Sequence, residues 1–524
     1  MLSAAFPYIG SVPPIAFFAL VPLLILEEHI FTKRLRARKF FWHVYLTFIV
    51  YNALTCWWVY FASAGGLIMA VFANSLLMLF PWMLFHWTKK YVGVKEGYIS
   101  LPFFWLAFEY FHYHWELSWP WLNFGNMFSI VPSWVQWYEY TGILGGSLWI
   151  LLANLLIFQI LKNVWGRKQA WQKQRMLIVF LGALIFIPIL LSILLLQTRS
   201  LGETRTMEVT VVQPNIDPYN EKFSSPPKAQ IKKINDLAAQ KITDKTDFIV
   251  APETAIPTSI DEWHINEHPA IEDLHQTADS VAKAAWVIGA STHAVFDEKI
   301  SDAARPTKNG RFYESYNTAL LMEKGHPLIT YHKSKLVLGV EYLPFAWLLK
   351  PIESWAIDLG GTSGSLGIEK EPKVFTHNGF NIIPAICYES VYGAYLASFS
   401  QKDSIDALFI ITNDGWWKDT PGYRQHFSFA SLRAIEMRKP VVRSANTGWS
   451  GIIDPYGNVL HKTNWWEPNA FNYTVETNRI TTFYMRYGDI IGRTSGFASA
   501  LILLLVIVKF LRRFGTRTPF GGKK

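Results

Sequence analysis

The chain has 524 residues, of which 51% are hydrophobic, 16% are aromatic and only 17% are charged. A typical soluble protein has about 25% charged residues, so the low charged fraction disfavours an ordinary soluble enzyme. The high hydrophobic fraction excludes a disordered or collagen-like protein, which lacks apolar residues. Two cysteines exclude a disulfide scaffold and a metal site built from several cysteines. The net charge is +9, and its basic residues are unevenly distributed along the chain.

Long apolar runs predict several membrane-spanning helices. A span needs about 20 predominantly apolar residues, and runs near that length recur in the first 200 residues and once near the C-terminus. One such run could be a buried core helix, but six in one region indicate a membrane. The start of the chain lacks the basic segment of a cleavable signal peptide. We expect seven spans, at residues 1–26, 40–64, 65–85, 97–108, 141–161, 176–198 and 494–508.

The loops between these spans predict their orientation. Lys and Arg are concentrated in alternate loops and in the tail, at residues 31–39, 88–96, 162–175 and after residue 508. The outer loop at residues 115–140 contains neither. Cytoplasmic loops are enriched in Lys and Arg, so the basic loops are expected in the cytoplasm and the large polar region outside it. Met1 then lies on the outer side, unless a further span belongs before it.

The outer loop at residues 115–125 is rich in tryptophan and leaves two interpretations open. Trp115, Trp119 and Trp121 could form an aromatic belt at the membrane surface. Alternatively, the loop could shape a groove through which lipid reaches the outer domain. Composition favours neither.

The polar region has the pattern of an α/β domain. We divide the chain into about six membrane helices at residues 1–200, an outer α/β domain at 201–480, a C-terminal span at 490–512 and a basic cytoplasmic tail at 513–524. Strands rich in β-branched residues are predicted at 207–213, 248–251, 286–290, 316–322, 382–386, 407–412 and 441–444. Helices are predicted at 228–240, 271–284 and 427–438, a hairpin at 451–462 and a flexible loop at 360–367.

Cys387 is the first candidate for chemistry, because it directly follows a predicted strand. A nucleophile at a strand-to-helix turn is exposed beside backbone N–H groups. The alternative is a buried structural cysteine, which is our interpretation of Cys56 inside a span. A free thiol in an oxidising compartment is a liability unless it is used.

Two further candidates also lie at strand ends. Glu253 follows the strand at 248–251, and the carboxyl ends of strands are typical site positions in α/β sheets; a capping or surface acid is an equally open interpretation. Lys333 ends another strand-like run, where a lysine is more often simply solvated.

In combination, the order Glu253, Lys333, Cys387 resembles the nitrilase superfamily of carbon–nitrogen hydrolases and acyltransferases. The matching motifs are Pro-Glu-Thr-Ala at 252–255, Tyr-His-Lys at 331–333 with Glu341 and Pro344, Ile-Cys-Tyr-Glu at 386–389, and the stretches at 413–417, 425–426, 433–436 and 443–448. With spans on both sides and Trp-Pro-Trp-Leu-Asn-Phe-Gly at 119–125, the whole chain resembles the bacterial apolipoprotein N-acyltransferase family, whose members usually carry one further N-terminal span.

This resemblance implies a fold and an activity. The fold would be a multi-span helical region joined to an extracytoplasmic nitrilase-like domain, a layered αββα sandwich. The activity would be transfer of an acyl chain from a phospholipid, through a thioester, to the α-amine of the S-diacylglyceryl cysteine of an apolipoprotein. Glu253 would act as general base, Lys333 as oxyanion donor and Cys387 as nucleophile, with Glu341, Tyr388 and Glu389 in support.

The same resemblance implies the setting of the reaction. No metal or cofactor is expected, and the partners would be a phospholipid donor, a diacylated apolipoprotein acceptor and the membrane, without nucleic acid. The protein would be a monomer in the bacterial inner membrane with its catalytic domain on the periplasmic side. The alternatives are a membrane-tethered amidase acting on a small amide, and a transporter or receptor. A tether needs one span, and a transporter predicts charged residues lining a path through the spans.

Overall fold

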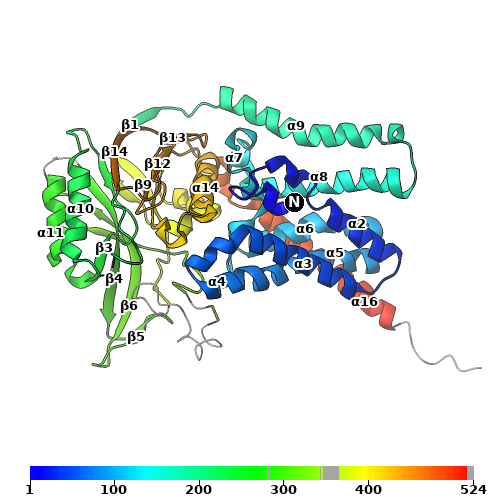
Figure 1. Cartoon of the computed structure of the whole chain (residues 1–524), viewed down its shortest axis with the longest axis horizontal. Helices are drawn as coiled ribbons and strands as arrows, with labels where there is room; N and C mark the ends of the chain where they lie inside the picture. The colour runs from blue at the N-terminus through cyan, green and yellow to red at the C-terminus, as the bar shows by residue number, and fades with distance from the viewer. Residues whose placement is uncertain (223, 280–283, 343, 346–364, 516–524) are drawn as a thin grey trace, which may run out of the picture.

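The computed structural model describes residues 1–222, 224–279, 284–342, 344–345 and 365–515. The molecule is elongated, with a bundle of long helices at one end and an α/β domain at the other (Figure 1). The predicted loop at 360–367 and the predicted basic tail at 513–524 lie largely outside the described residues.

The described chain contains six helical segments that are long and apolar enough to cross a membrane: Pro13–Thr32, Ala37–Phe61, Ala64–Tyr91, Ile143–Gly166, Trp171–Thr198 and Ile490–Arg512. The main helices of these segments are α2 (Val21–Thr32), α3 (Ala37–Cys56), α5 (Asn74–Tyr91), α8 (Ile143–Leu161), α9 (Arg175–Thr198) and α16 (Ile490–Gly515). Short elements between α3 and α5 are η2 (Trp57–Phe61), α4 (Ala64–Ile68) and η3 (Met69–Ala73).

Two of the seven predicted spans need correction. The first span lies at Pro13–Thr32 rather than at 1–26, because the start of the chain folds back on itself: α1 (Leu2–Ala5) is followed by a loop in which the Val12 amide donates to the Ala4 carbonyl. The run at 97–108 belongs to α6 (Val94–Phe111), which carries Lys95, Glu96 and Glu109 and is outside the six apolar segments. It nevertheless packs inside the bundle, against α5 and α16.

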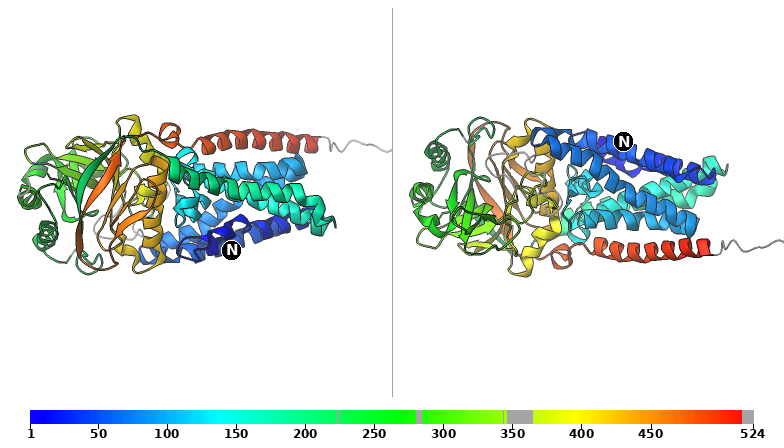
Figure 2. Two further views of the ribbon diagram at one scale, coloured as in Figure 1. Left: turned by 90° about the horizontal axis from the view of Figure 1, so that it is seen from above. Right: turned by 90° about the horizontal axis from the view of Figure 1, so that it is seen from below.

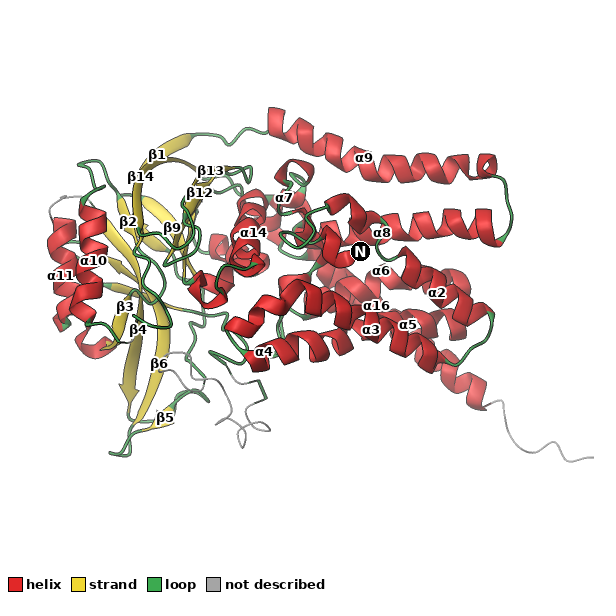
Figure 3. Ribbon diagram, in the orientation of Figure 1, coloured by secondary structure: helices red, strands yellow, loops and turns green. Residues whose placement is uncertain are grey.

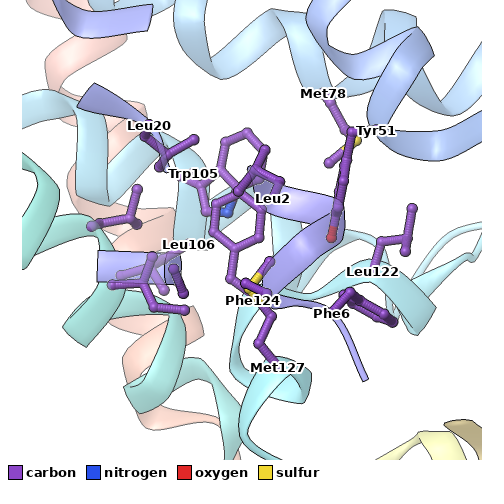
Figure 4. Packing of buried hydrophobic residues seen from close by; sticks show 14 of the residues in the cluster. Leu2, Phe6, Leu20, Tyr51, Met78, Trp105, Leu106, Leu122, Phe124 and Met127 are labelled. Carbon is purple, nitrogen blue, oxygen red and sulfur yellow. The ribbon is translucent and has the colours of Figure 1, made fainter. Parts of the chain in front are cut away.

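Aromatic side chains fill the centre of the bundle. Trp105 of α6 stacks on Phe124 of the outer loop with ring centres 4.5 Å apart, and on Phe48 of α3 at 5.5 Å. Figure 4 shows Trp105 and Phe124 packed among Leu2, Phe6 and other apolar side chains. Because the outer loop contributes Phe124 to this core, it is held rigidly against the helices.

In contrast, α9 and α16 line the outside of the bundle (Figure 2). Their apolar side chains are largely exposed: only 6% of the α9 segment and 17% of the α16 segment are buried inside the protein. Long apolar helices with exposed side chains are stable only where lipid covers them.

The α/β domain contains two sheets that pack face to face. The first has the order β14-β1-β2-β4-β6-β5, with β3 on β4 and β7 on β6; the second has the order β13-β12-β11-β10-β9-β8. Their bounds are β1 Thr204–Gln213, β2 Phe248–Val250, β3 Ile256–Asp261, β4 Ala285–Phe296, β5 Arg305–Pro306, β6 Phe312–Met322, β7 Ile329–His332, β8 Phe375–His377, β9 Phe380–Ile386, β10 Ala407–Thr412, β11 Val441–Ala445, β12 Gly451–Ile453, β13 Val459–Lys462 and β14 Asn469–Asn478.

Helices cover the outer face of each sheet, which completes the predicted αββα sandwich (Figure 3). The helices α10 (Pro227–Ala239) and α11 (Pro269–Asp279) cover the first sheet, and α14 (Pro421–Met437) covers the second on the side of the bundle. Between the sheets, Phe248 contacts Phe409 with ring centres 5.2 Å apart. All seven predicted strands, the hairpin and the three predicted helices are confirmed, with shifts at their ends.

The outer loop joins the domain to the bundle. It contains α7 (Tyr138–Thr141), and its side chains bond directly to α14: Trp121 donates to Gln425 at 2.8 Å, and Ser129 and Ser428 are 2.8 Å apart. At the end of α14, Arg438 pairs with Glu139 at 2.9 Å. The basic loops after α2 and α8 lie at the opposite end of the bundle (Figure 1).

Candidate active site

The fold brings the three predicted residues to one cavity at the junction of the sheets. Glu253 follows β2, Lys333 follows β7 and Cys387 follows β9, and all three line a cavity of about 140 Å³. The strands β2 and β9 lie in different sheets. Because both sheets open toward this cavity at their carboxyl ends, residues 134 positions apart become neighbours.

Lys333 is the most buried of the three, with 1% of its surface exposed. Its Nζ lies 2.8 Å from Glu341 Oε1 and 3.1 Å from Glu253 Oε1. Burial alone would lower the pKa of this amine, but the two carboxylates outweigh it and hold the pKa well above its usual range. Lys333 is therefore a fixed ammonium at the cavity wall.

Glu253 is held in place by three donors. Besides Lys333, Asn317 Nδ2 donates to Glu253 Oε1 at 2.7 Å, and the backbone amide of Asn413 donates to Oε2 at 3.1 Å. Burial raises the pKa of this carboxyl, but the Lys333 charge, the Asn317 amide and the nearby Lys222 charge outweigh it and leave the pKa below its ordinary value. Glu253 is thus ionised and oriented.

Cys387 sits in a backbone conformation that side chains rarely adopt, with φ of +49°. Such left-handed conformations in residues other than glycine are concentrated at functional sites. Burial, with the negative charge of Glu253, raises the pKa of its thiol, while Lys333 acts in the opposite direction. The thiol is therefore protonated in the resting site. Cys56 is also a free, buried cysteine, but it lies at the end of α3 within a membrane segment.

The supporting residues surround this centre in different ways. Glu341 accepts from Lys333 and, through its second oxygen, from the Val337 amide at 2.8 Å. Glu389 lies behind the cavity, where its Oε1 accepts from the Ser334 amide at 2.6 Å and its Oε2 from the Ile386 amide at 2.8 Å. Tyr388 stacks against Trp119 of the outer loop with ring centres 6.2 Å apart.

Some residues of the site escaped the sequence analysis. Asn317 bridges both carboxylates, donating to Glu253 at 2.7 Å and to Glu341 at 3.0 Å. Its only signal is an amide side chain at the point where β6 changes from a mixed to a mainly apolar sequence. Lys222 is buried at the cavity wall and bonds to Thr254, and burial lowers the pKa of its amine to about 8. No motif marks it.

A second, apolar groove of about 360 Å³ reaches the same cysteine from the bundle. The residues that line both spaces are Ala62, Val337, Val340, Cys387 and Trp417. The groove runs along η2, α4 and η3 and is covered by Leu117, Trp119 and Trp121 of the outer loop. Leu117, Trp119 and Trp121 therefore form part of the wall of a groove, which favours the second of the two interpretations of the outer loop. Ser63 caps α4 through a bond from the Gly66 amide at 2.9 Å.

Within the described residues, no group of three or more His, Cys, Asp and Glu side chains could hold a metal ion. In the cavity wall, the Lys333 ammonium and the Asn317 amide nitrogen are bonded to the carboxylates of Glu253 and Glu341. What the arrangement supplies is an oriented carboxylate, a fixed ammonium and a thiol at the mouth of an apolar groove.

Comparison with known proteins identifies the family of this chain. The family model described as carbon–nitrogen hydrolase matches residues 208–483, more than half of the chain. The chain belongs to the carbon–nitrogen hydrolase family. A second model, the apolipoprotein N-acyltransferase N-terminal domain, matches residues 1–156 of the bundle.

Similar proteins from two bacteria extend the match to nearly the full length. The apolipoprotein N-acyltransferase of Chlorobaculum tepidum is 27% identical, over 97% of this chain and 95% of the relative. That of Geobacter metallireducens is 26% identical, over 94% of this chain and 90% of the relative. Among solved structures, XC1258 of Xanthomonas campestris, a CN-hydrolase superfamily protein, aligns with a TM-score of 0.36 and 14% identity, over 52% of this chain and 91% of that chain.

Proposed function

We propose that this chain is an apolipoprotein N-acyltransferase, which moves an acyl chain from a membrane phospholipid to the α-amino group of the N-terminal S-diacylglyceryl cysteine of apolipoproteins. The observation that carries the proposal is the apolar groove that leads from the bundle to Cys387. A hydrolase of a small soluble amide has no use for such a groove. The full-length similarity to proteins named for this activity supports the same conclusion.

The first half-reaction is acylation of Cys387. The Cys387 thiol attacks the carbonyl carbon of the phospholipid ester, and its proton passes to Glu253, the general base. The negative charge that develops on the carbonyl oxygen of the ester is stabilised by the Lys333 ammonium. When the tetrahedral intermediate collapses, the ester C–O bond breaks, Glu253 returns the proton to the leaving oxygen, and a lysophospholipid departs. The product is a thioester on Cys387.

The relative acidities explain why the thiol reacts only with substrate present. The pKa of Cys387 is raised and that of Glu253 is lowered, so proton transfer between them is unfavourable in the resting site. As the S–C bond forms, negative charge builds on the carbonyl oxygen beside Lys333 and the sulfur-bound proton becomes more acidic, so its transfer to Glu253 becomes favourable. A free cysteine outside the cytoplasm is thereby kept as a poorly reactive thiol.

The second half-reaction consumes the thioester. The neutral α-amine of the diacylated cysteine attacks the thioester carbonyl, and Glu253 accepts a proton from the amine nitrogen. The C–S bond then breaks, an amide bond remains on the lipoprotein, and Cys387 recovers its proton. Glu341 and Asn317 hold Lys333 and Glu253 in position during both half-reactions. Glu389 holds the backbone before the nucleophile, and Tyr388 packs against the groove wall at Trp119.

We further propose that the protein works as a monomer in the bacterial inner membrane, with its catalytic domain on the periplasmic side. The support for this orientation is the position of the basic loops, which lie at the end of the bundle remote from the domain (Figure 1). The support for a monomer is that one chain supplies the base, the ammonium, the thiol and the groove.

A transfer assay tests the proposal. The purified protein in phospholipid vesicles is given a short peptide with an N-terminal S-diacylglyceryl cysteine, and the products are weighed by mass spectrometry. The proposal requires a peptide heavier by one acyl group and an equal amount of lysophospholipid. Peptide that stays diacylated, while small amides are hydrolysed, would instead indicate an amidase.

A further inference from the structure

His426 lies directly behind the nucleophile, on the buried side of Cys387. It belongs to α14, and 1% of its surface is exposed. Its Nε2 lies 3.2 Å from the carbonyl oxygen of Cys387 and 2.9 Å from Ser390 Oγ, and Ser390 itself donates to the same carbonyl at 2.7 Å. Neither residue lines the cavity that holds Glu253 and Lys333.

The partners of the other ring nitrogen determine where the proton sits. Arg443 Nη2 lies 2.8 Å from His426 Nδ1 and 2.9 Å from Asp414 Oδ2, so its two protons have two acceptors. Asp414 Oδ1, 3.0 Å from Nδ1, already accepts from Thr412 at 3.0 Å and from Arg443 Nη2 at 3.2 Å. If Nδ1 accepts from Arg443, the neutral ring carries its proton on Nε2. That tautomer is the one that bonds to the Cys387 carbonyl, which can only accept.

Burial and the neighbouring Arg443 charge keep this ring neutral, because both lower the pKa of His426 and outweigh Asp414. The charged and titratable groups against the ring are therefore Arg443 from β11, Asp414 from the segment after β10 and Cys387 itself. The proposed mechanism uses neither Arg443 nor Asp414, although both side chains are fully buried.

The ring also touches the wall of the apolar groove. Its centre is 5.7 Å from that of Trp121 and 5.5 Å from that of Trp417, and both indoles line the groove. Trp121 is tied to the neighbouring residue as well, through its bond to Gln425 at 2.8 Å. His426 therefore lies between the indoles that an acyl chain would contact and the backbone of the nucleophile.

We propose that His426 is a positioning residue: its Nε2–H holds the Cys387 carbonyl, and this bond fixes the left-handed turn that presents the thiol to the cavity. A φ of +49° is unfavourable for a cysteine and persists only when the surroundings over-determine it. The Asp414–Arg443 pair keeps the imidazole in the required tautomer and orientation. This inference rests on the proposed function only in that it assumes Cys387 to be the nucleophile.

The test compares His426→Phe with His426→Gln. Phenylalanine keeps the ring contacts with Trp121 and Trp417 but has no N–H, whereas glutamine retains a side-chain N–H near the Nε2 position. Acylation of Cys387 is followed by intact-mass spectrometry with two donors, a phospholipid and the small activated ester p-nitrophenyl acetate. His461→Phe, in β13 of the same domain, is the matched control, and thermal unfolding of each variant is recorded.

Misplacing a reacting group by about 1 Å can cost about 10²-fold in rate, so His426→Phe should lower kcat by about that factor with both donors. The phospholipid KM should stay near the wild-type value, and His426→Gln should recover most of the loss. Labelled histidine spectra should report a neutral Nε2–H ring in the wild type. The inference is overturned if His426→Phe keeps kcat within threefold of wild type, if it changes KM alone, or if glutamine restores nothing.

The two donors keep this test separate from that of the proposed function. A wild-type protein that is acylated by p-nitrophenyl acetate but never by phospholipid would contradict the proposed function. The comparison of His426→Phe and His426→Gln with the small ester would still decide the role of His426.

Discussion

The carboxylate of Glu389, two residues after Cys387, accepts the backbone N–H of Ser334, the residue after Lys333, at 2.6 Å. Its other oxygen accepts the Ile386 amide at 2.8 Å. One buried side chain thus ties the loop of the oxyanion donor to the turn of the nucleophile. The carboxylate therefore holds the segment after Lys333 against the turn that bears Cys387.

Measuring thermal stability as a function of pH tests the role of the Glu389 carboxylate in linking these two segments. Burial raises the pKa of Glu389 to about 7, so the folded state binds this proton more tightly than the unfolded state, whose pKa is about 4.3. The ionised carboxyl then reduces stability as pH rises from about 4.5 to 7. Glu389→Gln does not titrate, so its Tm relative to wild type should rise between pH 5 and 8. Acylation by this variant should fall at every pH, because the glutamine NH₂ group faces backbone N–H donors. A Tm difference that is independent of pH would contradict this account.

The two cysteines should respond differently to the same substitution. Cys387→Ala removes the nucleophile and should abolish thioester formation and lysophospholipid release, with the fold and membrane insertion retained. Cys56→Ala, in α3, should leave activity near wild type because it does not line either space. Cys387→Ser should also be nearly inactive, since an alcohol ionises far less readily than a thiol. Lysophospholipid release by Cys387→Ala would refute the assignment.

Lys333 and Lys335 provide a matched pair of charges. Lys335 lies outside the carboxylate cluster, with its Nζ 5.1 Å from the centre of the Tyr395 ring and 5.6 Å from that of Tyr392. Losing one oxyanion donor costs about 10²–10³ in rate, so Lys333→Ala should reduce acylation by at least that range, whereas Lys335→Ala should stay within a few-fold. Lys333→Arg should rescue poorly, because a planar guanidinium cannot replace a compact ammonium between two carboxylates.

Equal losses at both lysines would argue for general attraction of lipid headgroups. In that case the loss at Lys335, the less buried of the two lysines, should shrink as salt is raised, because charges near solvent are screened over about 10 Å at 0.1 M salt.

Filling the apolar groove should separate the lipid donor from the chemistry. Ala73 lines the groove at the end of η3, and Ala73→Trp should place an indole where an acyl chain would lie. Acylation by phospholipid should fall at least about tenfold, since loss of apolar contact area weakens binding, while acylation by p-nitrophenyl acetate should be unchanged. Ala183→Trp, on the outer helix α9, is the control. A parallel loss with both donors would mean that the substitution distorts the site.

Much of the catalytic domain could be predicted because its strands are short, apolar and bounded by turns. Glu253, Lys333 and Cys387 stood out because each is a reactive side chain at a predicted strand end, and the family pattern linked them. Asn317 could not be found in this way. Its side chain reaches the cavity only because β6 pairs with β7 in a particular register, with Thr318 opposite His332, and a single strand does not reveal its partner.

The groove was equally hard to predict in detail. Its walls combine η2, α4 and η3 with the outer loop, and their approach depends on the packing of Trp105 and Phe124 in the bundle. The charged helix α6 shows the limit of hydropathy. Trp105 donates to the buried Glu109 side chain at 2.8 Å and the Phe124 amide donates to it at 2.9 Å. These bonds allow an acidic residue inside the bundle, on a helix that the apolar run at 97–108 predicted to be a span.

The most direct test of the account is to trap the acyl-enzyme. The wild-type protein in phospholipid vesicles, without any amine acceptor, is weighed intact and after digestion. We predict one acyl group per chain, located on Cys387 and removed by neutral hydroxylamine, which cleaves thioesters. A chain that transfers acyl groups to a diacylated peptide without ever carrying one on Cys387, with kinetics requiring both substrates bound together, would contradict the covalent mechanism.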